Sequence, residues 1–292
     1  MLTAMKNDHK KFCFTRWFNR SQWIFPIISM IVAFGIWAIS SAWPANASFF
    51  DLFSGGIQVI QLSNLSDRQE IDLGRQMNQQ ILQTQFHLIN DSVITQYVNR
   101  VGQHLVSYSQ RPNIPYHFQV VKDKQINAFA TTGGYVYVTT ALLAAADNEA
   151  QLASVLGHEM GHIAARHVIK QMKQQAIESG IVSAVGLNKN TAVNLGVQLA
   201  LNLPGSRQHE FEADHKGLFT FTKAGYDASA MPAFMQKLVN SSSVPAFLST
   251  HPATPDRIRT LNQLITENHL SNGSLGLGNT NYKATIRSRL NS

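Results

Sequence analysis

Two histidines and a glutamate within residues 157–162 have the types and spacing needed to activate water on a metal ion. His158 and His162 are four residues apart, so on a helix they lie about 40° apart around the axis and can reach one ion. Zinc accepts imidazole nitrogen in a near-tetrahedral shell. Glu159, next to the first histidine, can take a proton from a water molecule that the metal activates. The pattern is the H-E-x-x-H motif of zinc proteases, and it predicts His158 and His162 as ligands and Glu159 as the catalytic base.

A catalytic zinc site needs a third protein ligand and an open position. A third histidine of the H-E-x-x-H-x-x-G-x-x-H type is missing, because Val168 stands in its place. His167 comes one residue early, and we expect it at the surface or behind the ligands. Glu210 and Asp214 share a helix face, so we predict Glu210 as the third ligand and Asp214 as the acceptor of the outer N–H of a ligating histidine. Glu212 should point about 160° away from Glu210, toward solvent. The plainer alternative is an acidic helix face that makes ordinary salt links.

The elements that must position these residues are mainly helices, with a few strands. Apolar residues at helical spacing predict one long helix over residues 148–179, with Asp147 as its N-cap, and this helix carries the histidines. A helix over residues 208–224 carries Glu210 and ends at Gly225. Strands are expected over residues 116–121, 127–132 and 135–139, with a turn at Gly133 and Gly134, and further helices are expected from residue 67, after residue 91, and over residues 228–240 and 255–267.

The motifs His158-Glu159-x-x-His162 and Glu210-x-x-Ala213-Asp214 are preceded by Asn127-Ala128-Phe129-Ala130 and Gly133-Gly134-Tyr135-Val136-Tyr137-Val138. Together these segments resemble metallopeptidase family forty-eight over about residues 67–259. The resemblance implies an α+β, mainly α fold, a gluzincin-type zinc metallopeptidase domain with a small β-sheet beside the active-site helix. It also implies one zinc ion (Zn²⁺) per chain.

The strand just before the zinc helix receives a role from this resemblance. In similar zinc proteases such a strand is an exposed edge that pairs with extended substrate backbone. We therefore expect Tyr135, Val136, Tyr137 and Val138 to form the substrate edge. Sequence alone does not distinguish an edge strand from a central one.

His251 is a further candidate for the site. Pro252 disfavours helix at His251 and places it on a short, constrained loop. In some family members a histidine in a matching loop lies close to the zinc, so the resemblance implies that His251 acts as a fourth ligand or gating residue in a resting state. Two alternatives stay open: His251 stabilises the oxyanion of the transition state, or it never meets the metal.

The N-terminus has the composition of a targeting segment. The formal net charge is +7, and the first 20 residues hold five Lys and Arg against one Asp. Residues 24–39 are strongly apolar, and Ala45-Asn46-Ala47 is an A-x-A pattern. Residues 1–47 are therefore predicted as a signal peptide, with an uncleaved anchor as the alternative. We expect an exported protein, periplasmic or otherwise extracytoplasmic, which is membrane-anchored if this segment remains.

The rest of the composition excludes some function classes. Cys13 is the only cysteine and lies before the apolar stretch, so the processed chain has neither a disulfide nor a catalytic thiol. No later Lys/Arg block exists, which argues against a nucleic acid partner.

The predicted domain organisation is simple. Residues 48–66 form a loosely attached N-terminal arm, residues 67–267 the zinc metalloprotease domain, and residues 268–292 a flexible tail rich in Asn, Ser and Gly. Residues 177–203 form an apolar insert that Lys189 interrupts. We interpret it as a helical hairpin packed on the core; the alternative is a surface that touches a membrane or a membrane protein.

The function predicted from these features is that of an exported zinc metalloendopeptidase. Its polypeptide substrates would be misfolded or misassembled envelope proteins. The alternative is a chaperone-like assembly factor with tightly restrained proteolysis, although the intact Glu159 argues against an inactive site.

Overall fold

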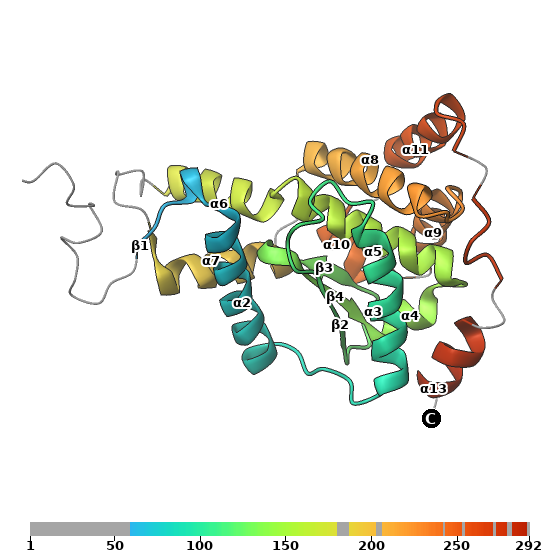
Figure 1. Cartoon of the computed structure of the whole chain (residues 1–292), viewed down its shortest axis with the longest axis horizontal. Helices are drawn as coiled ribbons and strands as arrows, with labels where there is room; N and C mark the ends of the chain where they lie inside the picture. The colour runs from blue at the N-terminus through green and yellow to red at the C-terminus, as the bar shows by residue number, and fades with distance from the viewer. Residues whose placement is uncertain are drawn as a thin grey trace, which may run out of the picture. The chain divides into compact units, whose positions relative to one another are not determined.

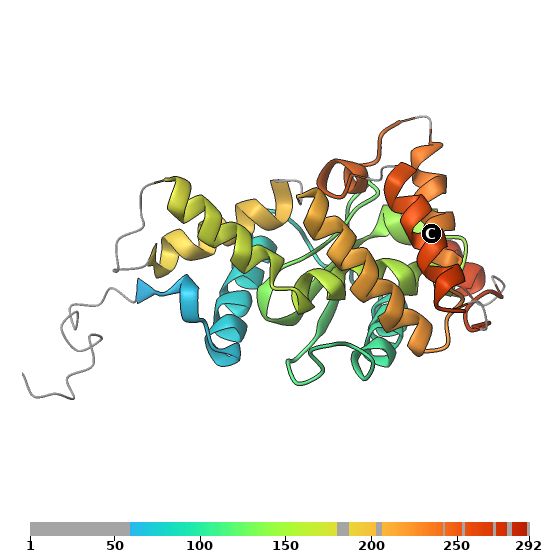
Figure 2. The ribbon, with the colours of Figure 1, turned by 90° about the horizontal axis from the view of Figure 1, so that it is seen from above.

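The computed structural model describes residues 59–179, 187–202, 206–241, 243–252, 255–270, 273–278 and 282–290. Over these ranges helices surround a small three-stranded sheet (Figures 1 and 2), which confirms the predicted α+β, mainly α fold. The predicted signal peptide, residues 1–47, and residues 48–58 of the predicted arm lie outside the described residues.

The three-stranded sheet has the order β2-β4-β3 and mixes parallel and antiparallel pairing. β2 (His117–Val121) runs parallel to β4 (Tyr135–Thr139), and β3 (Ala128–Ala130) runs antiparallel to β4. The predicted turn between β3 and β4 exists: Gly133 and Gly134 have φ values of 73° and 97°, a region in which residues with a Cβ are strained. Because β4 lies between the other two strands, the prediction that it forms an exposed edge is wrong.

Helices provide most of the remaining described structure. The longer ones are α2 (Asp67–Thr84), α3 (Ser92–Val106), α5 (Glu149–Ala164), α6 (His167–Glu178), α7 (Lys189–Asn202), α8 (Arg207–Lys223), α9 (Ala230–Val239) and α11 (Pro255–Glu267). The shorter elements are β1 (Val59–Ile60), η3 (Leu62–Asn64), η4 (Thr132–Gly134), α4 (Thr140–Ala145), β5 (Leu187–Asn188), α10 (Ala246–Thr250), the π-helical turn η5 (Lys283–Arg287) and α13 (Ser288–Leu290).

The single long helix predicted over residues 148–179 is in fact two helices. α5 ends at Ala164 and α6 begins at His167, and between them Arg166 takes the left-handed conformation, with φ 57° and ψ 38°. The apolar pattern continues across this break, so periodicity alone did not reveal it. The break lets α6 leave the direction of α5 directly after the histidine motif.

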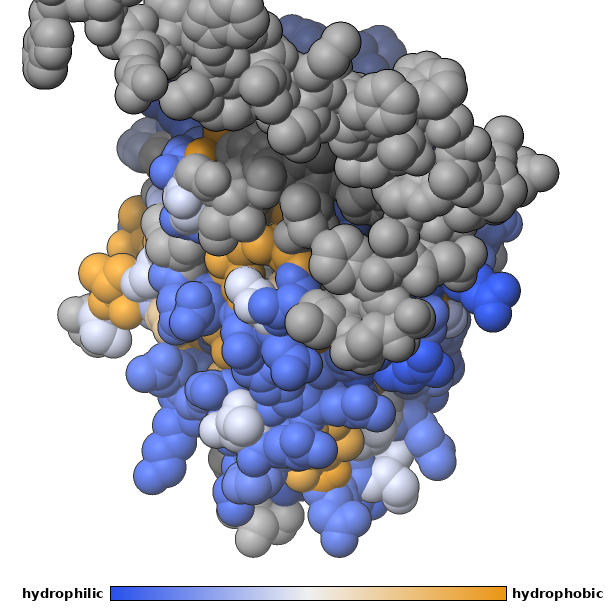
Figure 3. All heavy atoms as spheres, turned by 90° about the vertical axis from the view of Figure 1, so that its left-hand side faces the viewer, coloured by the Kyte–Doolittle hydropathy of each residue, from blue (hydrophilic) through white to orange (hydrophobic). Residues whose placement is uncertain are grey.

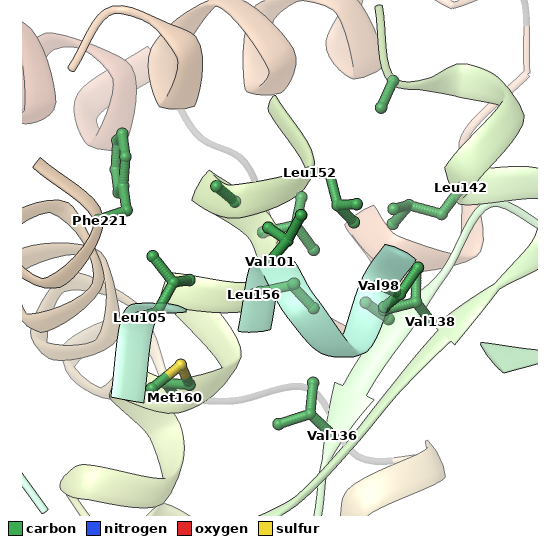
Figure 4. Packing of buried hydrophobic residues seen from close by; sticks show 14 of the residues in the cluster. Val98, Val101, Leu105, Val136, Val138, Leu142, Leu152, Leu156, Met160 and Phe221 are labelled. Carbon is green, nitrogen blue, oxygen red and sulfur yellow. The ribbon is translucent and has the colours of Figure 1, made fainter. Parts of the chain in front are cut away.

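The main core lies between α3, α5 and the sheet. Figure 4 shows side chains from α3 and α5 meeting those of β4, and all of them are buried. Phe221 of α8 extends this core on the other side of α5. The helix that carries the histidines is thus fixed by apolar contacts on several sides. The labelled contacts include Val98, Val101 and Leu105 of α3, Leu152, Leu156 and Met160 of α5, and Val136 and Val138 of β4.

A second apolar cluster contains the described part of the insert 177–203. Val193, Val197 and Leu199 of α7 are buried in it, together with Met77 of α2 and Met172 of α6. This part therefore packs on the protein, as the helical-hairpin interpretation predicts. Figure 3 faces the side where α2, α6 and α7 lie in Figure 1, and its described side chains are mainly hydrophilic with separate hydrophobic patches. Among the described residues no helix has the length and hydrophobicity required to cross a bilayer.

Two predicted flexible segments are partly packed. At the N-terminal side, β1 pairs with β5, and Leu62 and Leu65 are buried, so residues 59–66 are not a loose arm. At the C-terminal side, Tyr282 is fully buried and its hydroxyl donates to the carbonyl of Leu143 (2.8 Å). The prediction of a flexible tail is therefore wrong for residues 282–290, where Tyr282 and Ile286 provide apolar anchors among polar neighbours.

Candidate metal centre

α5 presents the three motif residues from the protein interior. Asn148 caps the helix by accepting a hydrogen bond from the backbone N–H of Gln151 (2.9 Å), one residue later than the predicted cap at Asp147. His158 and Glu159 are 2% and 0% exposed, so neither belongs to a solvated helix face. One helical turn separates His158 from His162, and both rings reach the same point.

α8 approaches α5 closely because glycines occupy the crossing. A Cβ atom at Gly161 would lie 2.5 Å from the carbonyl oxygen of Ala213, and one at Gly217 would lie 2.8 Å from the carbonyl oxygen of Gly157. Neither position has room for a larger residue. The close contact places Glu210, near the start of α8, beside the histidines of α5.

Four side chains converge at this point. The Nε2 atoms of His158 and His162 are 3.1 Å apart, and the two oxygens of the Glu210 carboxylate lie 3.4 Å from them, one near each nitrogen. Nδ1 of His251 lies 3.3 Å from Nε2 of His158 and 3.3 Å from the Glu210 carboxylate. One donor atom from each of the four residues lies within 4.8 Å of all the others, which is a geometry that can hold a metal ion.

Behind His158 lies a buried ion pair. Nδ1 of His158 is 2.9 Å from Oδ1 of Asp214, as expected for a carboxylate that orients a ligating imidazole. Arg257 of α11 donates to both oxygens of Asp214 (2.7 Å each) and lies 2.9 Å from Glu210. The structure therefore places Asp214 where the sequence predicts it and adds Arg257 as its partner.

Behind His162 lies a different pair of groups. Nδ1 of His162 is 2.8 Å from Nδ1 of His167, and Nε2 of His167 is 3.1 Å from Oε2 of Glu212. His167 is only 2% exposed, so it lies behind the ligands and not at the surface. The expectation that Glu212 points to solvent is wrong, because its side chain, 35% exposed, bends back onto His167 and Lys170.

The chain is similar enough to known proteins to show its family. The sequence matches Peptidase family M48 over residues 93–265, which is more than half of the chain. The chain belongs to peptidase family M48. The match includes the four converging side chains of the M48 site and most of the core around them.

Curated relatives of this M48 chain come from bacteria and from mitochondria. The beta-barrel assembly-enhancing protease of Escherichia coli (strain K12) is 37% identical over 213 residues, which cover 67% of this chain and 44% of that protein. The mitochondrial metalloendopeptidase OMA1 of Schizosaccharomyces pombe is 31% identical over 180 residues, 59% of this chain and 53% of that protein. The chain thus spans about half the length, or less, of these relatives.

The ionisable groups of the M48 site shift one another's pKa values. Burial raises the pKa of Glu159, and both of its carboxylate oxygens are buried without a hydrogen-bond partner. Burial disfavours the charged form of Glu210, but His251 and His162 hold its pKa well below the ordinary value. Burial likewise opposes a charge on His158, yet Asp214 and Glu210 raise its pKa to about 9. Burial lowers the pKa of His162 well below 6.5.

Arg257 and the His167–Glu212 pair are the parts of the site that sequence reasoning did not assign. Arg257 has a signal in retrospect: it lies four residues before the apolar Leu261 and so shares the apolar face of α11, where the structure buries both. A buried arginine requires a carboxylate partner, and Asp214 supplies it. His167 has no such signal, because its burial depends on the break between α5 and α6.

Proposed function

We propose that this chain is a zinc-dependent metalloendopeptidase that hydrolyses peptide bonds with a zinc-activated water molecule. The observation that carries the proposal is the buried group of His158, His162 and Glu210 next to the carboxylate of Glu159, which has no hydrogen-bond partner. Two imidazoles and a carboxylate are ligands that zinc accepts, and Glu159 is placed beside them as a base. The donor set therefore fits the ion.

Bound zinc supplies a Lewis acid that lowers the pKa of its water to about 7 and polarises the substrate carbonyl. His158, His162 and Glu210 would hold the ion, while Asp214 and Arg257 orient His158. Glu159 takes the proton from the attacking water and later delivers it to the leaving amine. Its burial raises its pKa, which makes the carboxylate a stronger base.

We infer that β3, in place of β4, is the strand that pairs with substrate. β3 is an edge of the sheet, and it lies next to α5. Thr131 N–H donates to Tyr135 C=O, and Thr139 N–H donates to Asn127 C=O, so Asn127, Phe129 and Thr131 face β4. The backbone groups of Ala128 and Ala130 then point away from β4, and Ala130 is 7% exposed. Ala130→Pro removes one outward N–H, and we expect it to raise KM for a peptide substrate more than it lowers kcat.

His251 is proposed as a resting-state ligand. Its Nδ1 lies 3.3 Å from His158 and Glu210, and Nε2 lies 3.6 Å from Glu159. In this position it occupies space that water or a substrate carbonyl needs. His251→Ala should therefore raise basal casein turnover. A fall in kcat with zinc retained would indicate the oxyanion role instead, and unchanged turnover would mean that His251 does not control the metal.

The proposed substrates are misfolded or misassembled envelope proteins, and the proposed location is extracytoplasmic. Support comes from the A-x-A pattern at Ala45–Ala47 and from the names of the bacterial relatives, which describe an enhancer of beta-barrel assembly. Mass spectrometry of protein from the native envelope should find Ser48 as the first residue. A complete N-terminus would instead support an anchor. Contact of residues 177–203 with a membrane or membrane protein remains a secondary proposal.

The deciding experiment is casein digestion by the purified full chain with and without a chelator. Zinc should copurify at about one ion per chain, and cleavage should stop on chelation and return on adding zinc. Absence of chelator-sensitive cleavage, together with binding of unfolded envelope proteins by wild type, would favour the chaperone-like assembly factor. Glu159→Gln can then serve as a trap, because it should hold substrates that mass spectrometry identifies.

A further inference from the structure

The two histidines of the metal centre are supported by different partners, and the difference concerns His167. His158 faces a carboxylate directly, since its Nδ1 lies 2.9 Å from Asp214. His162 faces no carboxylate; its Nδ1 lies 2.8 Å from Nδ1 of His167. A metal-ligating imidazole ordinarily donates its outer N–H to a carboxylate, a carbonyl or a water. In this chain a second imidazole takes that place.

The distances determine where the protons of the two rings must be. Nε2 of His162 points to the ligand cluster, so Nδ1 must carry the proton when Nε2 binds metal. Two nitrogens 2.8 Å apart share one proton, and His167 Nδ1 must therefore accept. The proton of a neutral His167 then sits on Nε2, which is 3.1 Å from Oε2 of Glu212. Each N–H donor in the hydrogen-bonded series His162–His167–Glu212 therefore faces an acceptor.

Glu212 is the last group of this hydrogen-bonded series, and two lysines hold its carboxylate in place. Nζ of Lys170 lies 3.2 Å from Oε2 of Glu212, and Nζ of Lys216 lies 3.6 Å from Oε1. The carboxylate oxygen that faces His167 is therefore fixed by a lysine from α6, while the second lysine comes from α8. The arrangement parallels Asp214, whose two oxygens are held by Arg257.

We propose that His167 is a positioning residue for the metal site: it accepts the outer proton of His162, donates its own to Glu212, and so fixes the tautomer and orientation of His162. The inference rests on the proposed metal site and deepens it. His167 touches neither metal nor substrate, and its effect passes through His162. The break at Arg166 is what makes the contact geometrically available, because it turns His167 back toward the preceding helical turn.

His209 provides a matched control. Its ring stacks on His167 at a centroid distance of 4.2 Å and an interplanar angle of 18°, but no hydrogen bond joins the two rings. His209→Ala therefore removes packing against His167 and leaves the hydrogen-bonded chain intact. His167→Ala removes both. His167→Asn restores an acceptor oxygen near the position of Nδ1 with little else of the ring.

The experiment measures zinc affinity of the purified full chain and its variants by competition with a chromogenic chelator. His167→Ala should bind zinc about 10–100-fold more weakly, as expected when the partner of a ligating histidine is lost. His167→Asn should recover much of that loss, Glu212→Gln should lose less than His167→Ala, and His209→Ala should match wild type. The visible spectrum of the cobalt-substituted protein should change in His167→Ala and return toward wild type in His167→Asn.

Thermal melting of the metal-free proteins distinguishes a positioning role of His167 from a role in folding. If metal-free His167→Ala melts far below wild type, the comparison of His167→Asn with His209→Ala decides, since the first tests the acceptor and the second tests packing. Equal zinc affinity of wild type and His167→Ala, or equal losses in His167→Asn and His167→Ala, would overturn the positioning role and leave the metal site standing. A wild-type chain that binds no zinc would instead refute the proposed function itself.

Discussion

Two buried carboxylate clusters in this protein are built in opposite ways. Glu70 of α2 is fully buried, and each of its oxygens accepts two hydrogen bonds, from Arg111 twice, from Thr132 and from Arg166. Glu159 of α5 is also fully buried, but neither of its oxygens has a hydrogen-bond partner. Nε2 of His251 lies 3.6 Å from Oε1 of Glu159 without a hydrogen bond, and burying a carboxylate without hydrogen bonds is unfavourable.

Because of this difference, we expect Glu70 to contribute to stability and Glu159 to contribute to catalysis. Glu70 connects the start of α2 with three segments that are distant in sequence: the loop after α3, η4 and the junction of α5 and α6. A fully satisfied carboxylate is a poor base, because its hydrogen bonds stabilise the charged form. A carboxylate without hydrogen bonds, such as Glu159, is a stronger base. We therefore expect changes at Glu159 to alter catalysis with the fold intact, and changes at Glu70 to alter stability with the site intact.

The largest effect is expected for Glu159→Gln. Loss of the base should lower kcat for casein by about 100- to 10,000-fold, while elemental analysis still finds about one zinc per chain. Glutamine has nearly the same shape, so circular dichroism and melting temperature should match wild type. Loss of zinc from this variant would show that Glu159 is a ligand and would remove the basis of the comparison.

The next largest effect is expected for zinc binding by Glu210→Gln. Replacing a direct ligand should weaken zinc affinity more than Asp214→Asn, for which a loss of about 10–100-fold is expected. Asp214 acts only through His158 and Arg257. Chelator competition gives both values under the same conditions. The reverse order would place Asp214 on the metal and Glu210 behind it.

Glu70→Gln should instead lower the free energy of unfolding, by about 3 kcal/mol, because it leaves Arg111 short of a partner in a buried position. This is the low end for a broken buried pair, since Asp67 still contacts both Arg111 and Arg166, and Arg166 is 36% exposed. Urea unfolding measures the change. Zinc affinity below the unfolding transition should equal that of wild type, and a large loss of affinity would contradict the separation of the two clusters.

The smallest effect is a pH dependence of stability that Glu70 contributes. Burial raises its pKa, but Arg111, Thr132 and Arg166 lower it below 4.5 overall. The stabilisation is therefore complete above pH 4.5 and declines as the pH falls through the lowered pKa of the folded state. Glu70→Gln should show a shallower decline of the unfolding free energy below pH 4.5 than wild type. Identical slopes in the two proteins would mean that Glu70 titrates alike in both states.

Local features of the sequence determined much of the fold and most of the site. The i, i+4 spacing of His158 and His162, and of Glu210 and Asp214, determines which side chains share a helix face, because helix geometry is the same in every context. The strands β2 to β4, the glycine turn and the main helices were likewise predictable from period and turn chemistry. The N-cap of α5 shifted by one residue, from the predicted Asp147 to Asn148.

Tertiary structure alone decided how these elements meet. The position of β4 between β2 and β3 depends on pairing with segments that are distant or reversed in direction, which no local pattern encodes. The burial of His167 and the return of Glu212 depend on the break at the left-handed Arg166, whose guanidinium donates to Glu70. Tyr282 packs at Leu143 across 139 residues. Such contacts arise from the balance of burial and chain entropy over the whole molecule, so a short window of sequence does not contain them.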